Sequence, residues 1–287
     1  MMQNHKPASK IQVPGREIDP RIYPSDPSGV FECHVRKRAR RPRQGWSLAT
    51  RGYYRCRLMK RGGEQIIPRP ESARPGAPNP WLEANADRLH LDRVRSVVAQ
   101  LDGRHLPDDL PTTPMRPPFV ATTRDSAVLL PLFLGVDGDL RVVLTRRSGR
   151  LNTHKGEVAF PGGRVDAGET NRDAALREAH EEIGLAPIHV EIIGTLEPLT
   201  TVVSASKITP FVGIVGSMPP LVANDSEVAR IFDVSLRELI DGDCYHEEIW
   251  DFADGTFPVW FFEVDGDTIW GATARMLRRL LDLLLLD

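Results

Sequence analysis

The chain has very little cysteine. Its 287 residues include three cysteines, Cys33, Cys56 and Cys244, which lie far apart and form no Cys-x-x-Cys pair. An odd number of widely spaced cysteines argues against a disulfide framework and gives no support to a zinc knuckle. Because such cysteine usage is typical of a reducing compartment, we expect the chain to be cytoplasmic.

Long apolar runs are missing as well. No stretch approaches the roughly 20 apolar residues that a membrane-spanning helix needs, and residues 1–30 lack the apolar segment of a signal peptide. With 41% hydrophobic and 26% charged residues, the composition is that of an ordinary soluble protein. We therefore expect neither a membrane partner nor secretion.

Acidic residues are scarce in the first part of the chain. Residues 1–80 hold 17 Lys and Arg against 6 Asp and Glu, whereas residues 81–287 hold 20 against 33. No apolar period of 2 or 3.6 runs through residues 1–80, which predicts a disordered or poorly packed basic, proline-rich segment. The basic run over residues 36–43 is most simply a solvated tail, and a nucleic-acid contact is the less favoured alternative.

The remainder of the chain has patterned apolar residues. Residues 81–119 are expected to form an amphipathic helix over 81–101 followed by a proline-rich connector. Residues 120–287 alternate between the composition of strands and that of helices, without a strict βαβ repeat, which predicts an α/β domain with a mixed sheet. The predicted strands are 126–134, 140–145, 190–196, 208–215 and 259–264, the first two forming a hairpin, and the predicted helices are 169–183, 235–240 and 272–286.

The helix over 169–183 has an unusual concentration of acid. Glu178, Glu181 and Glu182 are spaced so that their carboxylates project from one side of the helix. Neighbouring carboxylates repel one another and raise one another's pKa, and a hard divalent cation with oxygen ligands is the usual remedy. A solvated acidic helix face is the alternative interpretation.

The surrounding pattern resembles the box of the Nudix hydrolase family. Its fixed positions are matched in order by Gly163, Glu169, Arg177, Glu178, Glu181, Glu182 and Gly184, with Ala179 and Leu185 at the apolar positions. The resemblance covers roughly residues 120–285. It implies an α/β/α sandwich around a mixed sheet, in which this loop and helix bind Mg²⁺ or Mn²⁺ and hydrolyse a diphosphate.

Individual box residues have expected roles. Glu178 and Glu182, one helical turn apart, are the first choice as metal ligands, Glu181 is a further ligand or an outer partner, and the turn at Gly163 lets a backbone carbonyl approach the metal. Arg177 is expected to pair with Glu169 and to fix the loop against the helix. The general base is either a box glutamate or Glu227, which could also be a plain surface residue at the start of a strand.

The segment before the box narrows the substrate. The run from Leu144 through Phe160 to Gly163 resembles the signature of the coenzyme A diphosphatase branch of the family, except that Asn152 stands where that branch has arginine. Five cations in the same segment suit phosphate binding, although they could also be the solvent face of a strand and its loop. These predicted substrate-binding residues are Arg146, Arg147, Arg150, His154 and Lys155.

The sequence thus predicts a diphosphatase that cleaves coenzyme A or its thioesters with Mg²⁺ or Mn²⁺. The resemblance implies the products 3′,5′-ADP and 4′-phosphopantetheine or its acyl derivative. The alternatives are a Nudix hydrolase for another nucleoside diphosphate derivative such as ADP-ribose, and a ligand-sensing module without catalysis. The partner is expected to be a small molecule, and the oligomeric state is left open, a homodimer being compatible with the sequence.

Overall fold

The chain divides into two compact units, residues 1–59 and 60–287, which are described separately. The computed structural model describes residues 12–13, 16–17, 31–32, 55–56, 61–63, 65–101, 124–151, 154–201, 206–252 and 255–286. In the first unit, β1 (Gln12–Val13) pairs antiparallel with β2 (Arg16–Glu17), and β3 (Phe31–Glu32) pairs antiparallel with β4 (Arg55–Cys56). All further elements belong to the second unit.

The second unit is built on a mixed eight-stranded sheet. Its central path runs β10-β12-β6-β7-β13, with β11 beside β12, β8 beside β7 and β9 beside β6. The pairing of β12 with β6 is parallel and the other pairings are antiparallel. The strands are β6 (Arg124–Leu134), β7 (Leu140–Arg147), β8 (Val158–Ala159), β9 (Gly162–Arg164), β10 (Val190–Thr195), β11 (Leu199–Thr201), β12 (Ser206–Val215) and β13 (Val228–Ser235).

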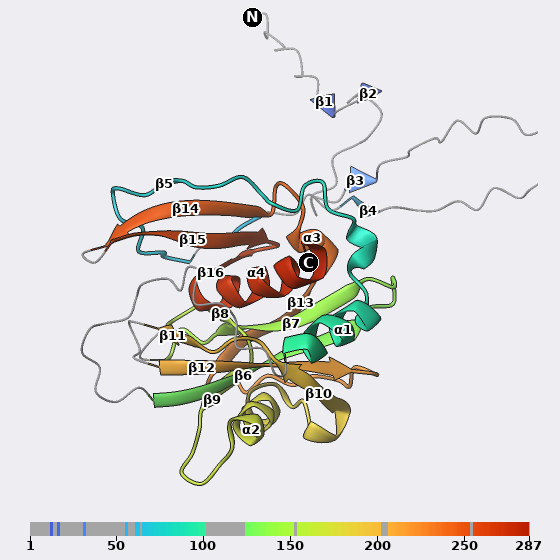
Figure 1. Cartoon of the computed structure of the whole chain (residues 1–287), viewed down its shortest axis with the longest axis vertical. Helices are drawn as coiled ribbons and strands as arrows, with labels where there is room; N and C mark the ends of the chain where they lie inside the picture. Colours follow the sequence, from blue (N-terminus) through green and yellow to red (C-terminus); the bar gives the residue numbers. More distant parts are fainter. Residues whose placement is uncertain are drawn as a thin grey trace, which may run out of the picture. The chain divides into compact units, whose positions relative to one another are not determined.

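Helices cover both faces of this sheet, as Figure 1 shows. Helix α2 (Asn171–Ile183) packs on one face, where small alanines on the helix meet Ala127, Leu129 and Val143 of the sheet. On the other face lie α1 (Leu91–Leu101) and α4 (Gly271–Leu285). This arrangement confirms the predicted mixed-sheet sandwich, since strands buried on both faces need apolar cover on each side.

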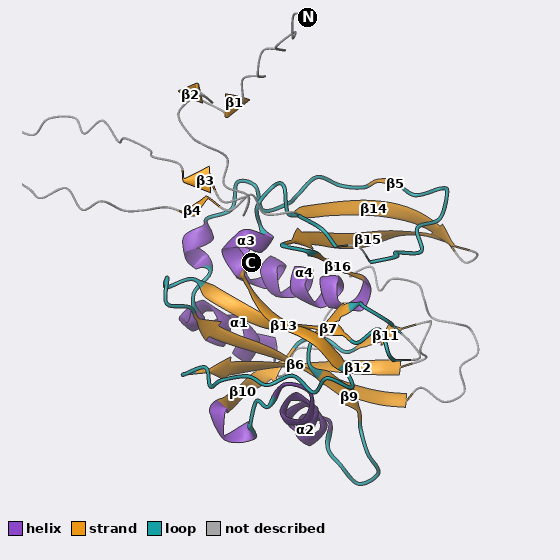
Figure 2. Ribbon diagram, turned by 180° about the vertical axis from the view of Figure 1, so that it is seen from behind, coloured by secondary structure: helices purple, strands orange, loops and turns teal. Residues whose placement is uncertain are grey.

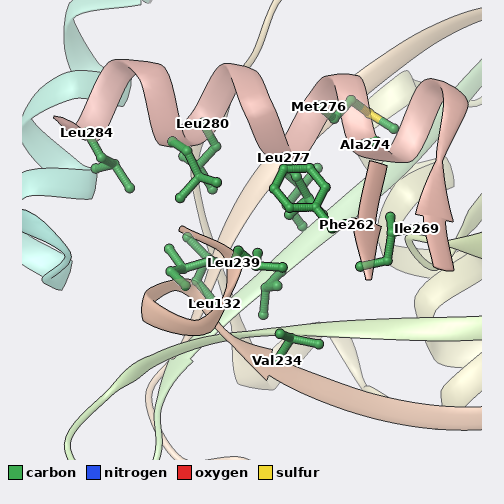
Figure 3. Packing of buried hydrophobic residues seen from close by; sticks show 14 of the residues in the cluster. Leu132, Val234, Leu239, Phe262, Ile269, Ala274, Met276, Leu277, Leu280 and Leu284 are labelled. Atoms are coloured by element: carbon green, nitrogen blue, oxygen red, sulfur yellow. The ribbon is translucent and has the colours of Figure 1, made fainter. Parts of the chain in front are cut away.

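A second, antiparallel sheet lies beyond α4, so that the helix is enclosed between two sheets (Figure 2). It has the order β16-β15-β14-β5, from β5 (Arg74–Pro75), β14 (Tyr245–Phe252), β15 (Gly255–Val264) and β16 (Asp267–Trp270). Figure 3 shows Leu277 and Leu280 of α4 packed toward Leu132 of the first sheet and Phe262 of the second. The short helix α3 (Leu236–Leu239) follows β13 and adds Leu239 to this core.

The predicted helix over 81–101 is only partly correct. Residues 91–101 are helical, but residues 81–90 form turns and a short 3₁₀ helix, η2 (Ala86–Arg88), which the Asn85 side chain caps by accepting from the Asp87 amide. Trp81 is buried, and its indole N–H donates to Asp282 of α4 at 3.0 Å. Trp81 is thus held by a tertiary contact with α4 and not by a helical hydrogen bond, which explains why residues 81–90 depart from a regular helix.

The poorly packed segment predicted for residues 1–80 does not extend that far in the structure. Residues 65–77 lie along the second sheet, where β5 pairs with β14 and Arg69 forms an ion pair with Glu248 at 2.8 Å. Arg69 also lies over the Phe261 ring at 4.8 Å, and Arg74 pairs with Asp251 at 2.9 Å. The segment is held by cations on an acidic sheet, and apolar periodicity gives no signal of such contacts.

Across the part of the chain that the structure describes, no helix is long and apolar enough to cross a membrane.

Candidate active site

The acidic helix α2 is defined by a cap at each end. The Thr170 hydroxyl accepts from the Asp173 amide at 3.1 Å and closes the N-terminus, as a threonine cap does. Gly184 ends the helix with φ 70°, a left-handed conformation that favours glycine. The predicted end of this helix at residue 183 is confirmed, and the start lies two residues after the predicted one.

The three helix glutamates do not share one environment. Glu182 is 3% exposed and accepts from the Gly162 amide at 3.2 Å, and Glu178 is half-buried beside Gly163. The Glu181 side chain, by contrast, is 55% exposed. Glu178 and Glu182 therefore face the glycine turn of β9, whereas Glu181 lies at the rim.

Glycine is needed at position 163. A Cβ added there would lie 2.4 Å from the carboxyl carbon of Glu178 and from one of its oxygens. Real Cβ atoms do not approach so closely, so any side chain would displace Glu178. The Glu178 carboxylate thus keeps its position against the turn only because residue 163 has no side chain.

Arg177 connects the loop to the helix. It donates to both carboxylate oxygens of Glu169, at 2.9 and 3.1 Å, and to Glu178 and Glu181 at 3.0 and 3.1 Å. A fifth contact, at 3.0 Å, reaches the backbone carbonyl of Arg164. The predicted pairing with Glu169 is confirmed, and these hydrogen bonds from Arg177 hold the pKa of Glu169 below its ordinary value.

The two inner carboxylates, Glu178 and Glu182, have raised pKa values. Burial raises the pKa of Glu182 to about 7, with repulsion from Glu178 and Glu227 adding to the effect and the Gly162 amide and Arg147 opposing it. Burial also raises the pKa of Glu178, which Arg177 partly offsets. The negative charge of Glu227 adds to the rise in the pKa of both groups, so this candidate base lies close enough to the helix glutamates to affect their ionisation.

The donor chemistry of this cluster fits a divalent cation. Oxygen ligands on consecutive helical turns, buried and mutually repelling, are stabilised when a hard cation enters. Within the described residues, however, no three acidic, histidine or cysteine side chains already converge into a finished metal site, and Arg177 occupies one oxygen of Glu178. Cation binding would therefore require small movements of these side chains.

Arg147 lies with the acidic cluster. Its Nη1 is 3.8 Å from a Glu182 oxygen, and its Nε is buried without a hydrogen-bond partner among the described residues. A buried guanidinium N–H without an acceptor is costly, so it provides a donor for an anionic oxygen of a ligand. This is the predicted phosphate-binding residue that the structure places most clearly at the site.

The other predicted substrate-binding residues are placed differently. Arg146 is not part of this cluster, because it pairs with the buried Asp267 at 3.2 Å on the opposite face of the sheet. His154 pairs with Glu157 at 2.9 Å, and Arg150 and Lys155 are exposed in the loop between β7 and β8. Asn152, the departure from the expected arginine, lies outside the described residues.

A shallow hollow adjoins the box loop. It is lined by Arg124, Asp125, Asn171 and the loop around Arg164 and Glu169. Sequence reasoning did not single out Arg124 or Arg164, because nothing in the order of residues indicates that the start of β6 lies beside β9. None of Glu178, Glu182 and Arg147 lines this hollow, so it lies beside the acidic cluster and not over it.

Comparisons with known proteins identify a domain family and relatives of this chain. A model of the NUDIX domain matches residues 123–241. Relatives from Yersinia pestis (strain Pestoides F) and Yersinia pseudotuberculosis (serotype O:1b), each described as an uncharacterized Nudix hydrolase NudL, are 37% identical over 163 residues, covering 56% of this chain and 80% of each relative. A solved Nudix hydrolase from M. smegmatis, RenU, is 24% identical with a TM-score of 0.36, over 40% of this chain and 73% of that one.

The fold and the box together define a hydrolase of diphosphate bonds. The chain belongs to the Nudix hydrolase family. Its substrates are accordingly nucleoside diphosphate derivatives, the class on which this family acts.

Proposed function

We propose that the chain hydrolyses the diphosphate of coenzyme A or its thioesters in the cytoplasm. The products would be 3′,5′-ADP and 4′-phosphopantetheine or its acyl derivative. The proposal is supported by the segment from Leu144 to Gly163, whose sequence resembles that of coenzyme A diphosphatases. No other feature distinguishes this substrate as clearly from other nucleoside diphosphate derivatives.

The observation that carries the proposal is the contact between Arg147 and Glu182. Arg147 belongs to the coenzyme A-like segment and Glu182 belongs to the Nudix box, and their side chains meet at 3.8 Å. The loop after Arg147 returns to the box, because β8 pairs back on β7 and the Arg147 amide donates to the Glu157 carbonyl at 2.9 Å. The segment is therefore folded against the catalytic helix, where it can act on the same substrate.

Glu178 and Glu182 would hold Mg²⁺ or Mn²⁺, with Glu181 and the Gly163 carbonyl as further ligands. The bound cation would supply positive charge to the diphosphate and make a water molecule more acidic, which addresses the repulsion that makes diphosphates inert. Arg177 would orient Glu178 and Glu181 through the hydrogen bonds described above. Glu169 in turn fixes Arg177 and keeps the loop in place.

Two groups of this chain would act on the reacting atoms. Arg147 would donate its free Nε–H to a phosphate oxygen and neutralise charge as the diphosphate bond breaks. A carboxylate, either Glu227 or the box glutamate Glu182, would accept the proton of the attacking water. Glu227 is the favoured base, because its charge acts on Glu178 and Glu182 whereas the Gly162 amide already occupies an oxygen of Glu182.

A substrate panel with purified full-length protein tests the proposal. Coenzyme A should be hydrolysed with a higher kcat/KM than 3′-dephospho-coenzyme A or ADP-ribose, and the products should be identified by mass spectrometry. If ADP-ribose is the better substrate, the coenzyme A assignment is wrong while the membership of the Nudix family stands. Absence of hydrolysis of every diphosphate in the panel would favour a ligand-sensing module.

A further inference from the structure

Asp267 is a fully buried carboxylate that lies outside the Nudix box. Its side chain is 0% exposed, and it accepts from Arg146 at 3.2 Å, from Arg230 at 2.9 Å and from Gln65 at 3.3 Å. Arg146 is on β7, Arg230 is on β13 and Asp267 is on β16 of the second sheet. One carboxylate therefore joins the two sheets and the segment that precedes the Nudix domain.

The two arginines face one another across neighbouring strands. Arg230 is directly opposite Arg146 in the β13–β7 register. Like charges at such positions repel, and these strands would be destabilised if nothing lay between the charges. Asp267 offsets the repulsion, so the register of β7 and β13 at this point depends on it.

An irregularity in β13 occurs at the same place. Val228 pairs with Arg147 and Arg230 pairs with Arg146, so β13 advances two residues while β7 advances one. In a regular strand, residues two apart point to the same face, but the extra residue of a bulge sends them to opposite faces. Bulges often direct side chains at active sites in this way. Here it lets Val228 pack on the α2 side while Arg230 points to Asp267.

The ion pairs of Asp267 with Arg146 and Arg230 are here called the clamp. Residues of the proposed catalytic machinery are attached directly to it. Arg147 follows Arg146 and points to the opposite face, toward Glu182. Glu227 precedes the bulge, and its carbonyl accepts from the Ser148 amide at 2.7 Å. A shift of β7 against β13 would consequently move both Arg147 and Glu227.

We propose that Asp267 is a positioning residue for hydrolysis, which sets Arg147 and Glu227 by clamping Arg146 and Arg230 on the far face of the sheet. This inference rests on the proposed function, because it takes Arg147 and Glu227 as the groups that act on the substrate. Asp267 itself touches neither the substrate nor the helix glutamates. A displacement of a catalytic group by about 1 Å can lower turnover a hundredfold, so a clamp of this kind has a large effect on rate.

The test compares Asp267→Asn with Glu247→Gln in the full-length protein. Glu247 is a matched control, because it is also a carboxylate of the second sheet, with a side chain only 8% exposed, and accepts from Arg278 at 3.0 Å and Trp260 at 2.8 Å, away from β7. Both variants should lose stability, measured by thermal unfolding. With the best substrate of the panel, Asp267→Asn should lower kcat by about tenfold to a hundredfold with a smaller change in KM, whereas Glu247→Gln should change kcat by less than about twofold.

A double-mutant cycle separates positioning from general damage. If Asp267 acts through Arg147, Asp267→Asn should have a much smaller effect on kcat in an Arg147→Ala background than in the unmutated protein. Additive effects in this cycle, or a folded Asp267→Asn variant with unchanged kcat, would overturn the proposal. If Asp267→Asn does not fold, Arg230→Ala replaces it, since the Arg230 side chain is 38% exposed and its loss removes one half of the clamp.

The outcome also distinguishes the proposal from the function on which it rests. Failure of the unmutated protein to hydrolyse any diphosphate would contradict the proposed function. Hydrogen exchange then decides the role of Asp267: faster exchange of the Arg147 and Ser148 amides in Asp267→Asn, but not in Glu247→Gln, would support the clamp. Unchanged exchange at these amides would contradict it.

Discussion

Arg146 and Arg147 are adjacent in the chain and act on opposite faces of the sheet. Arg146 reaches Asp267 in the second sheet, and Arg147 reaches Glu182 on α2. The cause is the alternation of side chains along a strand, which sends consecutive residues of β7 to different sides. The sequence groups both arginines as phosphate-binding cations, but the structure divides them into a structural cation and a candidate catalytic cation.

Replacement of Arg147 by alanine should slow hydrolysis of every substrate. Arg147 lies at the acidic cluster, where the diphosphate bond would be cleaved, so its loss removes a contact common to all diphosphates. A charge-assisted hydrogen bond contributes about 1.5–3 kcal/mol, which corresponds to a roughly tenfold to hundredfold loss in kcat/KM. Steady-state kinetics with coenzyme A and ADP-ribose would measure this loss.

Arg150→Ala is the control for that experiment. Arg150 is exposed in the loop after β7, three residues beyond Arg147, so it is a candidate for the 3′-phosphate of coenzyme A. Its loss should narrow the preference for coenzyme A over the 3′-dephospho form and leave the dephospho form unaffected. Equal effects of the two substitutions on all substrates would contradict the assignment of Arg147 to the scissile diphosphate.

Replacement of Gly163 by alanine should disable the site without unfolding the protein. The added methyl group would meet the Glu178 carboxylate, which must then move away from the turn. We expect turnover to fall by more than about tenfold and the Mn²⁺ concentration for half-maximal activity to rise. Gly149→Ala is the matched control, because a Cβ at Gly149 meets nothing within 4 Å; similar losses in both variants would argue against a specific effect on Glu178.

Local features of the fold were predictable from the sequence. The hairpin of β6 and β7, the limits of α2 and the pairing of Arg177 with Glu169 depend on turn residues, caps and short spacings, which are visible in the order of residues. They agree with the structure because their causes lie within a few residues of one another. The same holds for the box as a whole, which occupies residues 163–184.

Long-range features were not predictable in the same way. Asp267 and Arg146 are 121 residues apart, and no spacing rule connects them. The pairing of Arg69 with Glu248 spans 179 residues, so the sequence pattern alone gives no reason for residues 65–77 to pack. For Glu227, a position before a strand gave no information about which charges would lie near it, and its place beside the end of β7 depends on the hydrogen bond from the Ser148 amide to its carbonyl.

Removal of residues 1–59 and removal of residues 1–80 should have different effects on stability. The described core of the second unit is formed by residues within 81–285. The segment before it packs on the second sheet, where Arg69 lies over the Phe261 ring. A chain starting at Lys60 should unfold at nearly the same temperature as the full-length protein. A chain starting at Trp81 loses the β5–β14 pairing and the partly exposed ion pairs of Arg69 and Arg74, and should be less stable by about 1–2 kcal/mol, or roughly 2–8 °C in thermal unfolding.

One result of the truncations would contradict this prediction. Equal melting temperatures for the two shortened chains would show that residues 61–77 contribute nothing to the second unit. A full-length variant that combines Arg69→Ala with Arg74→Ala gives an independent measurement without changing chain length. The melting temperature of this double variant should fall between those of the two truncations.

Glu182 is expected to make the protein less stable as the pH rises. Its pKa in the folded protein is about 7, against an ordinary value of 4.5, so between these pH values the folded state retains a proton that the unfolded state has lost. Stability therefore decreases as the pH increases through this range, by about 3 kcal/mol for a shift of this size. A bound divalent cation would remove the penalty, because it favours the ionised carboxylate.

Glu182→Gln tests this linkage, since glutamine resembles the protonated carboxyl group at every pH. In the presence of a metal chelator, the free energy of unfolding of the variant relative to the unmutated protein should increase by up to about 3 kcal/mol between pH 4.5 and pH 8, as measured by urea titrations. The same variant should lose its activity by orders of magnitude, because an amide cannot supply ligand charge. If the difference in free energy of unfolding between Glu182→Gln and the unmutated protein does not change with pH, the pKa of Glu182 is not raised in solution. If Glu182→Gln remains active, Glu182 is not a ligand of the catalytic cation.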